Sequence, residues 1–300
     1  MSVHLGWGFG KTHVDYDEIS KNVQDKLYAD AQAFAKANKD RYDCGGYIYV
    51  GEGQDLGQFW AKLAVGNGKI QKSSSNTAVT KANDCYSLSG ATYGVYSDKG
   101  CTKFVATLTT DSNGNTDTAE LRAAKYYVKE TKAPKGFLLD KNVYTLTVKA
   151  GETAALKVSD TPKVTDTLVE LFKIDMETSK STAQGNASLE GAEFVWKYYD
   201  GYYTKENLPS EPTRTWTTKT IAEKGSKNEV HYITRLADAY KVSGDSFYTQ
   251  NGTICLPLGT ITVEEKTAPK GYLLEGAYMQ AAGSSEQIKG MYVAQITENG

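Results

Sequence analysis

The sequence YYVKETKAPKGFLLD at residues 126–140 returns at residues 261–275 as ITVEEKTAPKGYLLE. The Glu, Pro and Gly that the two stretches share at equal spacing are Glu130, Pro134, Gly136, Glu265, Pro269 and Gly271. After the first stretch, Val143, Thr145 and Thr147 alternate with Tyr144, Leu146 and Val148, which predicts a β-strand with one face toward the core. A Pro followed two residues later by Gly predicts a fixed turn in which the Gly takes a positive φ. The chain therefore contains a repeated β unit.

The repeat extends toward the N-terminus of each copy. The strand KIQKSS (69–74) and SLSGATYGVY (87–96) match ELFKID (170–175) and SLEGAEFVWKYY (188–199). Lys72 precedes Gly90 by 18 residues, and Lys173 precedes Gly191 by 18 residues. The offset between copies grows from 101 to 135 residues, so the second copy carries a 34-residue insertion before its EEKTAPKG turn.

The extent of the two copies divides the chain into three predicted segments. Residues 1–66 form a small α+β part, residues 67–163 the first β-sandwich, and residues 164–300 a second sandwich with the insertion. Pro162 cannot continue a strand ladder and marks the boundary between the sandwiches. The second sandwich ends without a Pro-terminated strand, and we expect it to be truncated at its last strand.

Composition favours a mainly β protein. The 300 residues include 21 Tyr but only 4 Met, and Val and Thr are abundant, a composition suited to pleated, half-buried surfaces. The net charge of −2 provides no field to attract nucleic acid. No apolar run is long enough to span a bilayer, and the N-terminus lacks the pattern of a secretion signal. We expect no cofactor, and no metal, since His4, His13 and His231 lack ligand spacing.

The segment before the repeats has its own pattern. Apolar residues at helical spacing between Asp17 and Asn38 predict one amphipathic helix, and residues 47–50 and 56–65 predict a short hairpin. The apolar stripe of the helix consists of Ile19, Val23, Leu27, Ala31, Phe34 and Ala35. Such a segment buries little apolar surface alone, so we expect it to be the end of a larger domain.

The four cysteines contain no CxxC pair, which excludes a zinc ribbon or a thioredoxin-like redox site. Cys85 and Cys101 flank one predicted hairpin. They form a disulfide if the compartment is oxidising and remain buried free thiols if it is reducing.

The repeated unit resembles the Cna B-type, SpaA-type prealbumin-like domains of Gram-positive cell-wall adhesins and pilins. Four motifs carry this resemblance as a set: the Lys-containing first strand, the GAxF strand, the VKETKAPKGFLLD block and the closing VSDTP. The resemblance covers residues 68–300 in two copies. It implies tandem prealbumin-like sandwiches. It also implies an intramolecular isopeptide bond, in which a lysine of the first strand attacks an Asn or Asp of the last strand beside a Glu.

In the first copy the resemblance assigns Lys72 as the nucleophile, Glu130 as the proton shuttle and Asp160 as the acceptor. A lysine is nucleophilic only when neutral, and burial among apolar side chains favours the neutral amine. Burial also favours a protonated glutamic acid, which can donate to the acceptor carbonyl. Lys69 and Asp166 are the alternative lysine and acceptor.

In the second copy Lys173 and Glu265 match the same pattern. The position equivalent to Asp160, counted from Glu265, is Gln295, which is no acceptor. Either Asn299 is the acceptor in a shifted register or the last strand lies beyond residue 300, and we favour the second interpretation.

Residues 3–65 also resemble, weakly, the closing part of a bacterial thioester domain. Such domains join a Cys to a Gln, and Cys44 with Gln54 is the available pair. Because the family places its Cys near the start of the domain, we expect Cys44 to be a structural cysteine.

The insertion near residues 197–256 is rich in Tyr and Trp. Trp216, Tyr199 and Tyr203 are candidates for a platform that binds a glycan or a protein ligand. The alternative, which we favour, is a longer hairpin whose aromatic side chains pack on their own sandwich.

The resemblance therefore implies a structural stalk segment of a Gram-positive surface protein, extracellular and wall-anchored in its full-length form. Its partners are neighbouring domains of the same protein. Its only chemistry is single-turnover self-crosslinking. The alternatives are a module that binds a host protein or glycan and, ranked last, a glycoside hydrolase with paired carboxylates.

Overall fold

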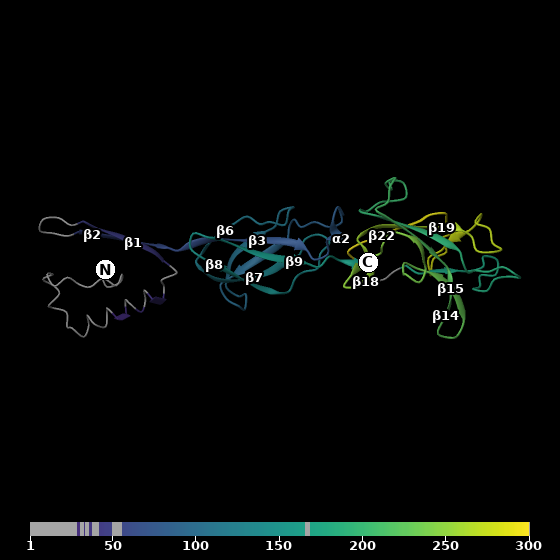
Figure 1. Ribbon diagram of the computed structural model, residues 1–300, viewed down its shortest axis with the longest axis horizontal. Coiled ribbons are helices and arrows are strands. Elements are labelled where there is room, and N and C mark those ends of the chain that lie inside the picture. The colour runs from purple at the N-terminus through teal and green to yellow at the C-terminus, as the bar shows by residue number, and fades with distance from the viewer. Residues whose placement is uncertain are drawn as a thin grey trace. The chain divides into compact units, whose positions relative to one another are not determined.

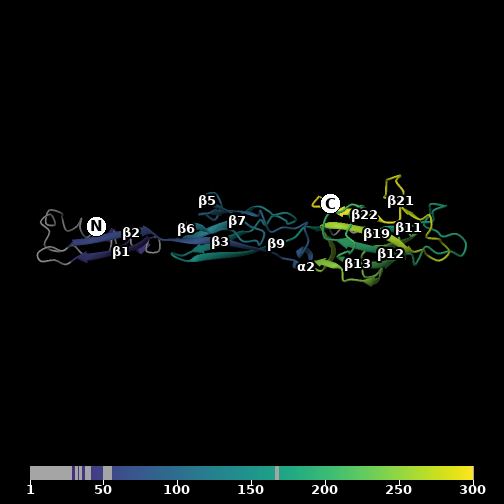
Figure 2. The ribbon, with the colours of Figure 1, turned by 90° about the horizontal axis from the view of Figure 1, so that it is seen from above.

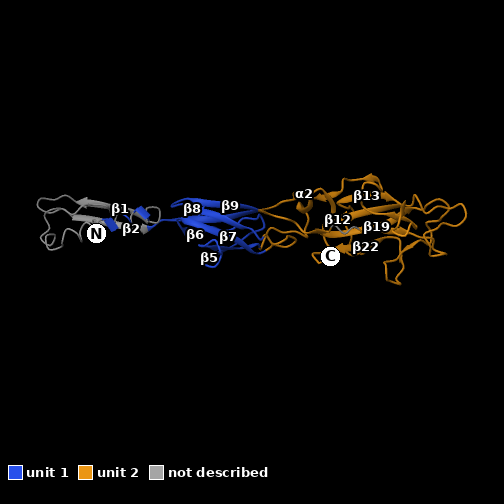
Figure 3. Ribbon diagram, turned by 90° about the horizontal axis from the view of Figure 1, so that it is seen from below, with its two compact units in different colours: residues 1–72, 91–132, 141–158 blue, residues 73–90, 133–140, 159–300 orange. Residues whose placement is uncertain are grey.

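The computed structural model describes residues 29–30, 33, 36–37, 42–49, 56–165 and 169–299. They form two compact units (Figure 3). Unit 1 comprises the described residues up to Lys72 together with residues 91–132 and 141–158, and unit 2 comprises residues 73–90, 133–140 and the described residues from Ser159 onward. Nearly all of the regular structure is β-strand, which confirms the predicted mainly β fold class.

The first repeat contains two facing sheets (Figure 1, Figure 2). One has the strand order β6-β3-β9 and the other β5-β4-β7-β8. The strands of these sheets are β3 (Val65–Ser74), β4 (Thr92–Tyr96), β5 (Phe104–Thr109), β6 (Ala119–Arg122), β7 (Ala124–Lys132), β8 (Val143–Val148) and β9 (Thr153–Asp160).

Period-2 alternation places the core between these two sheets. In β8, Leu146 and Val148 are buried, whereas Val143, Thr145 and Thr147 are exposed, as the sequence predicted. The same alternation in the other strands supplies a cluster of buried apolar side chains. Its largest members are Ile70, Tyr93, Val95, Leu108, Leu121, Tyr126, Val128, Leu146, Val148 and Val158.

The first and last strands of this repeat are neighbours and run parallel. The Asn67 amide donates to the Glu152 carbonyl oxygen at 2.8 Å, and the Ser75 amide donates to the Asp160 carbonyl oxygen at 2.9 Å. Eight residues separate the two contacts on each strand, so β3 and β9 advance together in the same direction. Their inward-facing side chains therefore lie in the same core layer.

Before β3, the strands β1 (Tyr42–Tyr49) and β2 (Leu56–Leu63) pair antiparallel from Tyr42 opposite Leu63 to Tyr49 opposite Leu56. This pairing confirms the predicted hairpin. Residues 29, 30, 33, 36 and 37 are helical and exposed. The predicted apolar stripe of the helix lies outside the described residues, as do His4 and His13.

Unit 2 is built on a five-stranded sheet of order β16-β13-β12-β19-β22, accompanied by the smaller sheets β11-β15-β14, β10-β18-β17 and β20-β21. Its elements are α2 (Thr77–Thr80), β10 (Val164–Thr165), β11 (Leu171–Lys173), β12 (Glu193–Tyr199), β13 (Arg214–Lys219), β14 (Ile221–Lys224), β15 (Val230–Thr234), β16 (Lys241–Gly244), β17 (Tyr248–Gln250), β18 (Thr253–Pro257), β19 (Gly259–Thr267), β20 (Tyr278–Met279), β21 (Ile288–Lys289) and β22 (Tyr292–Ile296).

The loops 73–90 and 133–140 of the first repeat pack into the core of unit 2. Buried Asn83 donates from Nδ2 to the Tyr198 hydroxyl at 2.8 Å, and the Tyr86 hydroxyl donates to the Lys163 carbonyl oxygen at 2.6 Å. Val79, Cys85, Tyr86 and Phe137 belong to the same apolar cluster as Trp196 and Trp216. These loops therefore fold with the second repeat rather than with the strands that they connect.

The glycines of the two repeated turns adopt the predicted conformation. Gly136 has φ +81° and Gly271 has φ +86°. A Cβ on Gly136 would lie 2.6 Å from Tyr86 Cδ1, so both the backbone angle and the close contact require glycine there. Among the described residues, no helix is both long enough and apolar enough to cross a bilayer.

Candidate functional site

Lys72 is buried in the core of the first repeat and is paired with Glu130. Its Nζ lies 2.7 Å from Glu130 Oε1, and neither side chain is exposed to solvent. The Lys72 Nζ also donates to the Tyr93 hydroxyl at 2.7 Å. Removing an ammonium and a carboxylate from water costs several kcal/mol for each ion, and close pairing must offset that cost. A fully buried lysine–glutamate pair is therefore unusual for a purely structural core.

Strand alternation explains why Lys72 faces inward. Ile70 and Lys72 are buried on β3, whereas Lys69 and Gln71 are half-buried on its other face. Lys69, the alternative nucleophile, thus faces away from the core that contains Glu130. Asp166, the alternative acceptor, lies outside the described residues.

Glu130 and Tyr93 reach Lys72 from the facing sheet. They are directly opposite each other in the β4–β7 ladder, and both are essentially fully buried. Sequence reasoning identified Glu130 but missed Tyr93. The available signal was the hydroxyl in GATY, which is absent from the matching GAEF of the second copy.

Asp160 is the last residue of β9, the strand next to β3 in the same sheet. Val158 and Asp160 are buried and Ser159 is exposed, so the Asp160 side chain faces the core. Only 1% of Asp160 is exposed. The predicted acceptor thus ends the strand that runs parallel to the strand of the predicted nucleophile.

The second repeat brings Lys173 of β11 and Glu265 of β19 together. Lys173 Nζ lies 2.7 Å from both Glu265 carboxylate oxygens. The Lys173 side chain is 16% exposed and that of Glu265 is 11% exposed. Phe194 is opposite Glu265 in the β12–β19 ladder, where the first repeat has Tyr93. The second pair therefore lacks the hydroxyl and is less enclosed.

Asn299 is not placed to accept a bond from Lys173. β22 is antiparallel to β19, with Val263 opposite Tyr292 and Gly259 opposite Ile296. Glu265 and Asn299 lie beyond opposite ends of this ladder, which keeps them at least about 14 Å apart along the strands. The shifted-register interpretation is therefore wrong.

Of the two alternatives for Cys85 and Cys101, a disulfide or free thiols, the structure has free thiols. Cys85 is buried in the apolar core of unit 2, and burial raises the pKa of its thiol. Cys101 lies in the turn between β4 and β5, in unit 1. Sequence proximity suggested one hairpin, but Cys85 belongs to the loop that folds with the other unit.

The aromatic residues of the insertion pack inward, as the favoured alternative predicted. Trp216 is fully buried and stacks on Phe247, with ring centroids 5.8 Å apart. Tyr199 is 4% exposed. Tyr203 is partly exposed, and its ring makes an edge contact with Tyr199. A ligand platform made of Trp216 and Tyr199 is therefore wrong, because neither ring faces solvent.

No described group of three or more His, Cys, Asp or Glu side chains has the arrangement of a metal site. Cys44 lies in β1 opposite Ala61, and Gln54 lies outside the described residues. The thioester pair that the N-terminal resemblance suggested therefore remains a prediction.

Comparison with known proteins identifies the first repeat. Residues 75–162 match the model of the SpaA family, described as a prealbumin-like fold domain. The chain contains a SpaA-type prealbumin-like domain. The match to this SpaA-type domain includes Glu130 and Asp160 and begins three residues after Lys72.

A curated relative is the trypsin-resistant surface T6 protein of Streptococcus pyogenes, 37% identical over 78 residues. That alignment covers 26% of this chain and 14% of the T6 protein. Similar solved structures include the Bacillus anthracis TIE protein, at 22% identity and a TM-score of 0.44, covering 86% of this chain and 39% of that one. Another is a C-terminal fragment of the pilus adhesin SpaC from Lactobacillus rhamnosus GG, at 16% identity and a TM-score of 0.37, covering 77% and 82%.

Proposed function

We propose that this chain is a structural segment of a Gram-positive surface protein, and that its SpaA-type domain is closed by an isopeptide bond between Lys72 and Asp160. The observation that carries the proposal is the Lys72–Glu130 pair, at 2.7 Å with no exposed side-chain surface. The burial of Asp160 at the end of the neighbouring parallel strand supports it.

The bond forms in a sequence of balanced steps. Lys72 transfers a proton to Glu130, its partner at 2.7 Å, which gives the neutral amine that nucleophilic attack requires. The neutral amine attacks Cγ of Asp160, and protonated Glu130 donates to the carboxyl oxygen on which charge develops. One C–N bond forms, one C–O bond breaks and one water leaves. The reaction needs no cofactor and consumes its own nucleophile, so the chain turns over once and is not an enzyme.

The crosslink gives the domain mechanical strength. It joins the first strand of the sandwich to the last, so tension applied at the domain ends passes through a covalent bond. It also closes the loop from residue 72 to residue 160 in the unfolded chain. The chain-entropy relation for a loop of this length gives a stabilisation of about 4 to 5 kcal/mol.

The name of the curated relative supports a surface setting for this domain, since the T6 protein is described as a surface protein. We propose that this chain is extracellular and wall-anchored in its full-length form, and that its neighbours are other domains of the same protein. The chain spans 14% of the T6 protein and 39% of the TIE protein.

Intact mass of the purified chain tests the bond. The wild type should be one water lighter than its sequence mass, and Lys72→Ala should match its own sequence mass. Lys69→Ala is the matched control, since Lys69 lies on the same strand with its side chain on the other face, and it should keep the water loss. A wild-type chain at its full sequence mass would refute the proposal.

A further inference from the structure

The nucleophile and the acceptor of the proposed bond belong to different compact units. Lys72 and Glu130 lie in unit 1, whereas Asp160 lies in unit 2, because the boundary between the units falls within β9, after Val158 (Figure 3). The contacts that fix the acceptor are therefore those of unit 2, the unit that contains the second repeat.

The backbone that follows Asp160 is held by the turn of the first repeat that contains Gly136. The Leu138 amide donates to the Thr161 carbonyl oxygen at 3.0 Å, and the Lys163 amide donates to the Gly136 carbonyl oxygen at 2.8 Å. Two of the three residues directly after β9 are thus fixed by backbone hydrogen bonds within unit 2.

Two side chains link the same backbone to the second repeat. Gln250 of β17 donates from Nε2 to the Pro162 carbonyl oxygen at 3.0 Å. The Tyr86 hydroxyl donates to the Lys163 carbonyl oxygen at 2.6 Å and accepts from the Leu258 amide at 2.9 Å. Through Gln250 and Leu258, the end of β9 is therefore connected to the strands of the second repeat.

Strand pairing continues this connection. β10 pairs antiparallel with β18, with Val164 opposite Pro257, and β18 pairs with β17, which carries Gln250. From Asp160 to Thr165 the chain is held by the fold of unit 2. Strand ends that lack such contacts open at low free-energy cost, so the second repeat limits the motion of the acceptor residue.

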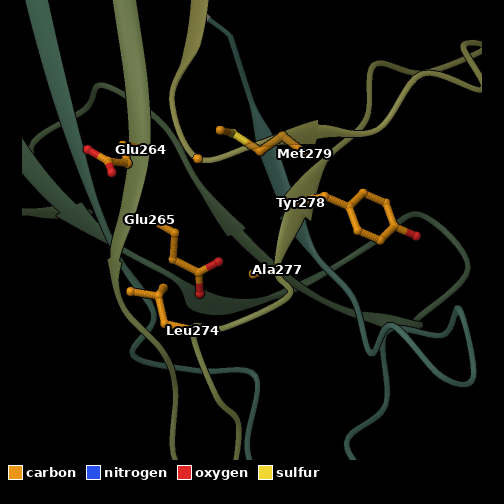
Figure 4. A pocket seen from close by; sticks show the side chains of 7 residues that line it. Glu264, Glu265, Leu274, Ala277, Tyr278 and Met279 are labelled. Carbon is orange, nitrogen blue, oxygen red and sulfur yellow. The ribbon is translucent and has the colours of Figure 1, made fainter.

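The equivalent turn of the second repeat has different surroundings. Leu274, which corresponds to Leu139, lines a cavity of about 180 Å³ together with Glu265. Figure 4 shows Leu274 and Ala277 beside the Glu265 carboxylate at the wall of this cavity. Glu265 nevertheless pairs with Lys173 at 2.7 Å. The lysine–glutamate pair thus forms without a closely packed turn, so in the first repeat the packed turn bears on the acceptor rather than on the pair.

The placement of the acceptor matters because nucleophilic attack is sensitive to distance. Reacting atoms must lie about 3 to 3.5 Å apart, and a displacement of about 1 Å can slow a reaction by about 100-fold. Asp160 is the last residue of β9, so a small shift of the strand end moves its carboxyl carbon directly.

We propose that Tyr86 and Gln250 are positioning residues for the bond of the first repeat, and that the bond therefore closes after the second repeat has folded. The inference rests on the proposed Lys72–Asp160 bond and names what controls it. Each side chain acts through the backbone of residues 162–163 and not by contact with the reacting atoms.

This arrangement gives the chain an order of maturation. The loops 73–90 and 133–140 first pack into the core of unit 2 with the second repeat. The end of β9 is then fixed, and the covalent bond closes last. Because the bond is not reversed, it retains the docked arrangement of both loops.

Tyr86→Phe and Gln250→Leu test this positioning in the full chain. Each variant removes the hydrogen bonds of one side chain and keeps most of its packing. Intact mass at fixed times after cell-free synthesis measures the rate of water loss. Each variant should lose water at least about fivefold more slowly than the wild type, as expected for the loss of one hydrogen bond, and should reach the same final mass difference.

The chain offers a matched control for each variant. Tyr126 is also buried, and its hydroxyl donates to the Arg122 carbonyl oxygen at 3.0 Å within unit 1. Gln295 donates from Nε2 to the Tyr203 carbonyl oxygen at 3.1 Å within the second repeat. Tyr126→Phe and Gln295→Leu remove the same kinds of hydrogen bond away from the end of β9, so both should lose water at the wild-type rate.

Stability measurements separate positioning from a general loss of structure. In a Lys72→Ala background, which cannot form the bond, Tyr86→Phe and Tyr126→Phe should each lower the midpoint of urea unfolding. With Lys72 present, only Tyr86→Phe should slow the water loss. A purely structural role for Tyr86 would give the two variants equal rates of water loss.

Two results would overturn the proposal. If the wild type loses water and both Tyr86→Phe and Gln250→Leu lose it equally fast, the second repeat does not position the acceptor, and the bond of the proposed function stands. If the wild type keeps its full sequence mass, the bond itself is refuted and this inference with it.

Discussion

The two repeats contain the same lysine–glutamate pair at the same distance but in different surroundings. Lys72 and Glu130 have no exposed side-chain surface, whereas Lys173 and Glu265 are 16% and 11% exposed. The first pair has a third strand beside its lysine and a tyrosine hydroxyl on its amine. The comparison teaches that the strand of the lysine and the facing strand of the glutamate suffice to form the pair. Exclusion of water from the pair requires a further strand beside the lysine, as β9 lies beside β3.

The largest expected effect comes from Glu130→Gln, which keeps the shape of the side chain but removes the proton acceptor. The bond should fail to form, and the variant should have its full sequence mass. The free energy of unfolding should fall by at least about 4 kcal/mol, since the loop constraint is lost and a buried ammonium loses its counter-ion. Urea denaturation measures the loss.

Glu120→Gln is the control for this change, because Glu120 is exposed on β6 of the same repeat. It should keep both the water loss and the stability of the wild type. A Glu130→Gln chain that still forms the isopeptide bond would show that the reaction does not need this carboxylate. The lysine–glutamate pairs of the two repeats could then no longer be compared as reactive groups.

Tyr93→Phe should have an intermediate effect. It removes one hydrogen bond to the Lys72 amine, worth about 1 kcal/mol, so bond formation should slow by about fivefold while the final yield is retained. Intact mass at fixed times after cell-free synthesis measures the rate. Equal rates for wild type and Tyr93→Phe would exclude a positioning role for the hydroxyl.

The smallest expected effect concerns Asp175, which follows Lys173 by two residues. The pKa of Asp175 is held well below its usual range by hydrogen bonds that its carboxylate accepts. The donors are the backbone N–H of Thr178, the hydroxyl of Tyr272 and the side-chain amide of Gln184. Ser74 occupies the equivalent position in the first repeat. A depressed folded-state pKa stabilises the fold above the unfolded value of about 3.9 and loses that contribution as the pH falls toward the folded value.

The second repeat should therefore lose stability from about pH 4 downward, and Asp175→Asn should flatten this dependence. Tryptophan fluorescence during urea unfolding at pH 3 and pH 7 reports the change, because Trp196 and Trp216 both lie in the core of unit 2. Asp238→Asn, at an exposed position, is the control. An unchanged pH dependence in Asp175→Asn would assign the acid sensitivity to other groups.

Two alternatives that the sequence left open fail for one physical cause. Asn299 as the acceptor and a Cys85–Cys101 disulfide both rested on order along the chain, but strand direction and loop packing separate these groups in space. Tyr93 was missed because nothing in a lone GATY motif shows what faces it across the sandwich. The aromatic insertion was correctly expected to pack inward, since Tyr and Trp bury large areas whenever a core is available.

Equal intervals of Lys, Glu, Pro and Gly in two copies, together with period-2 alternation, were enough to predict a mainly β chain with repeated sandwiches, and the family resemblance added the expectation of a buried Lys72. These are local properties, set by backbone geometry over a few residues. Which side chains meet across two sheets depends on strand order, and only the folded chain shows that β9 lies beside β3 and that β15 lies beside β11. Strand pairing is a long-range choice made by burial of the whole core, which no short stretch of sequence contains.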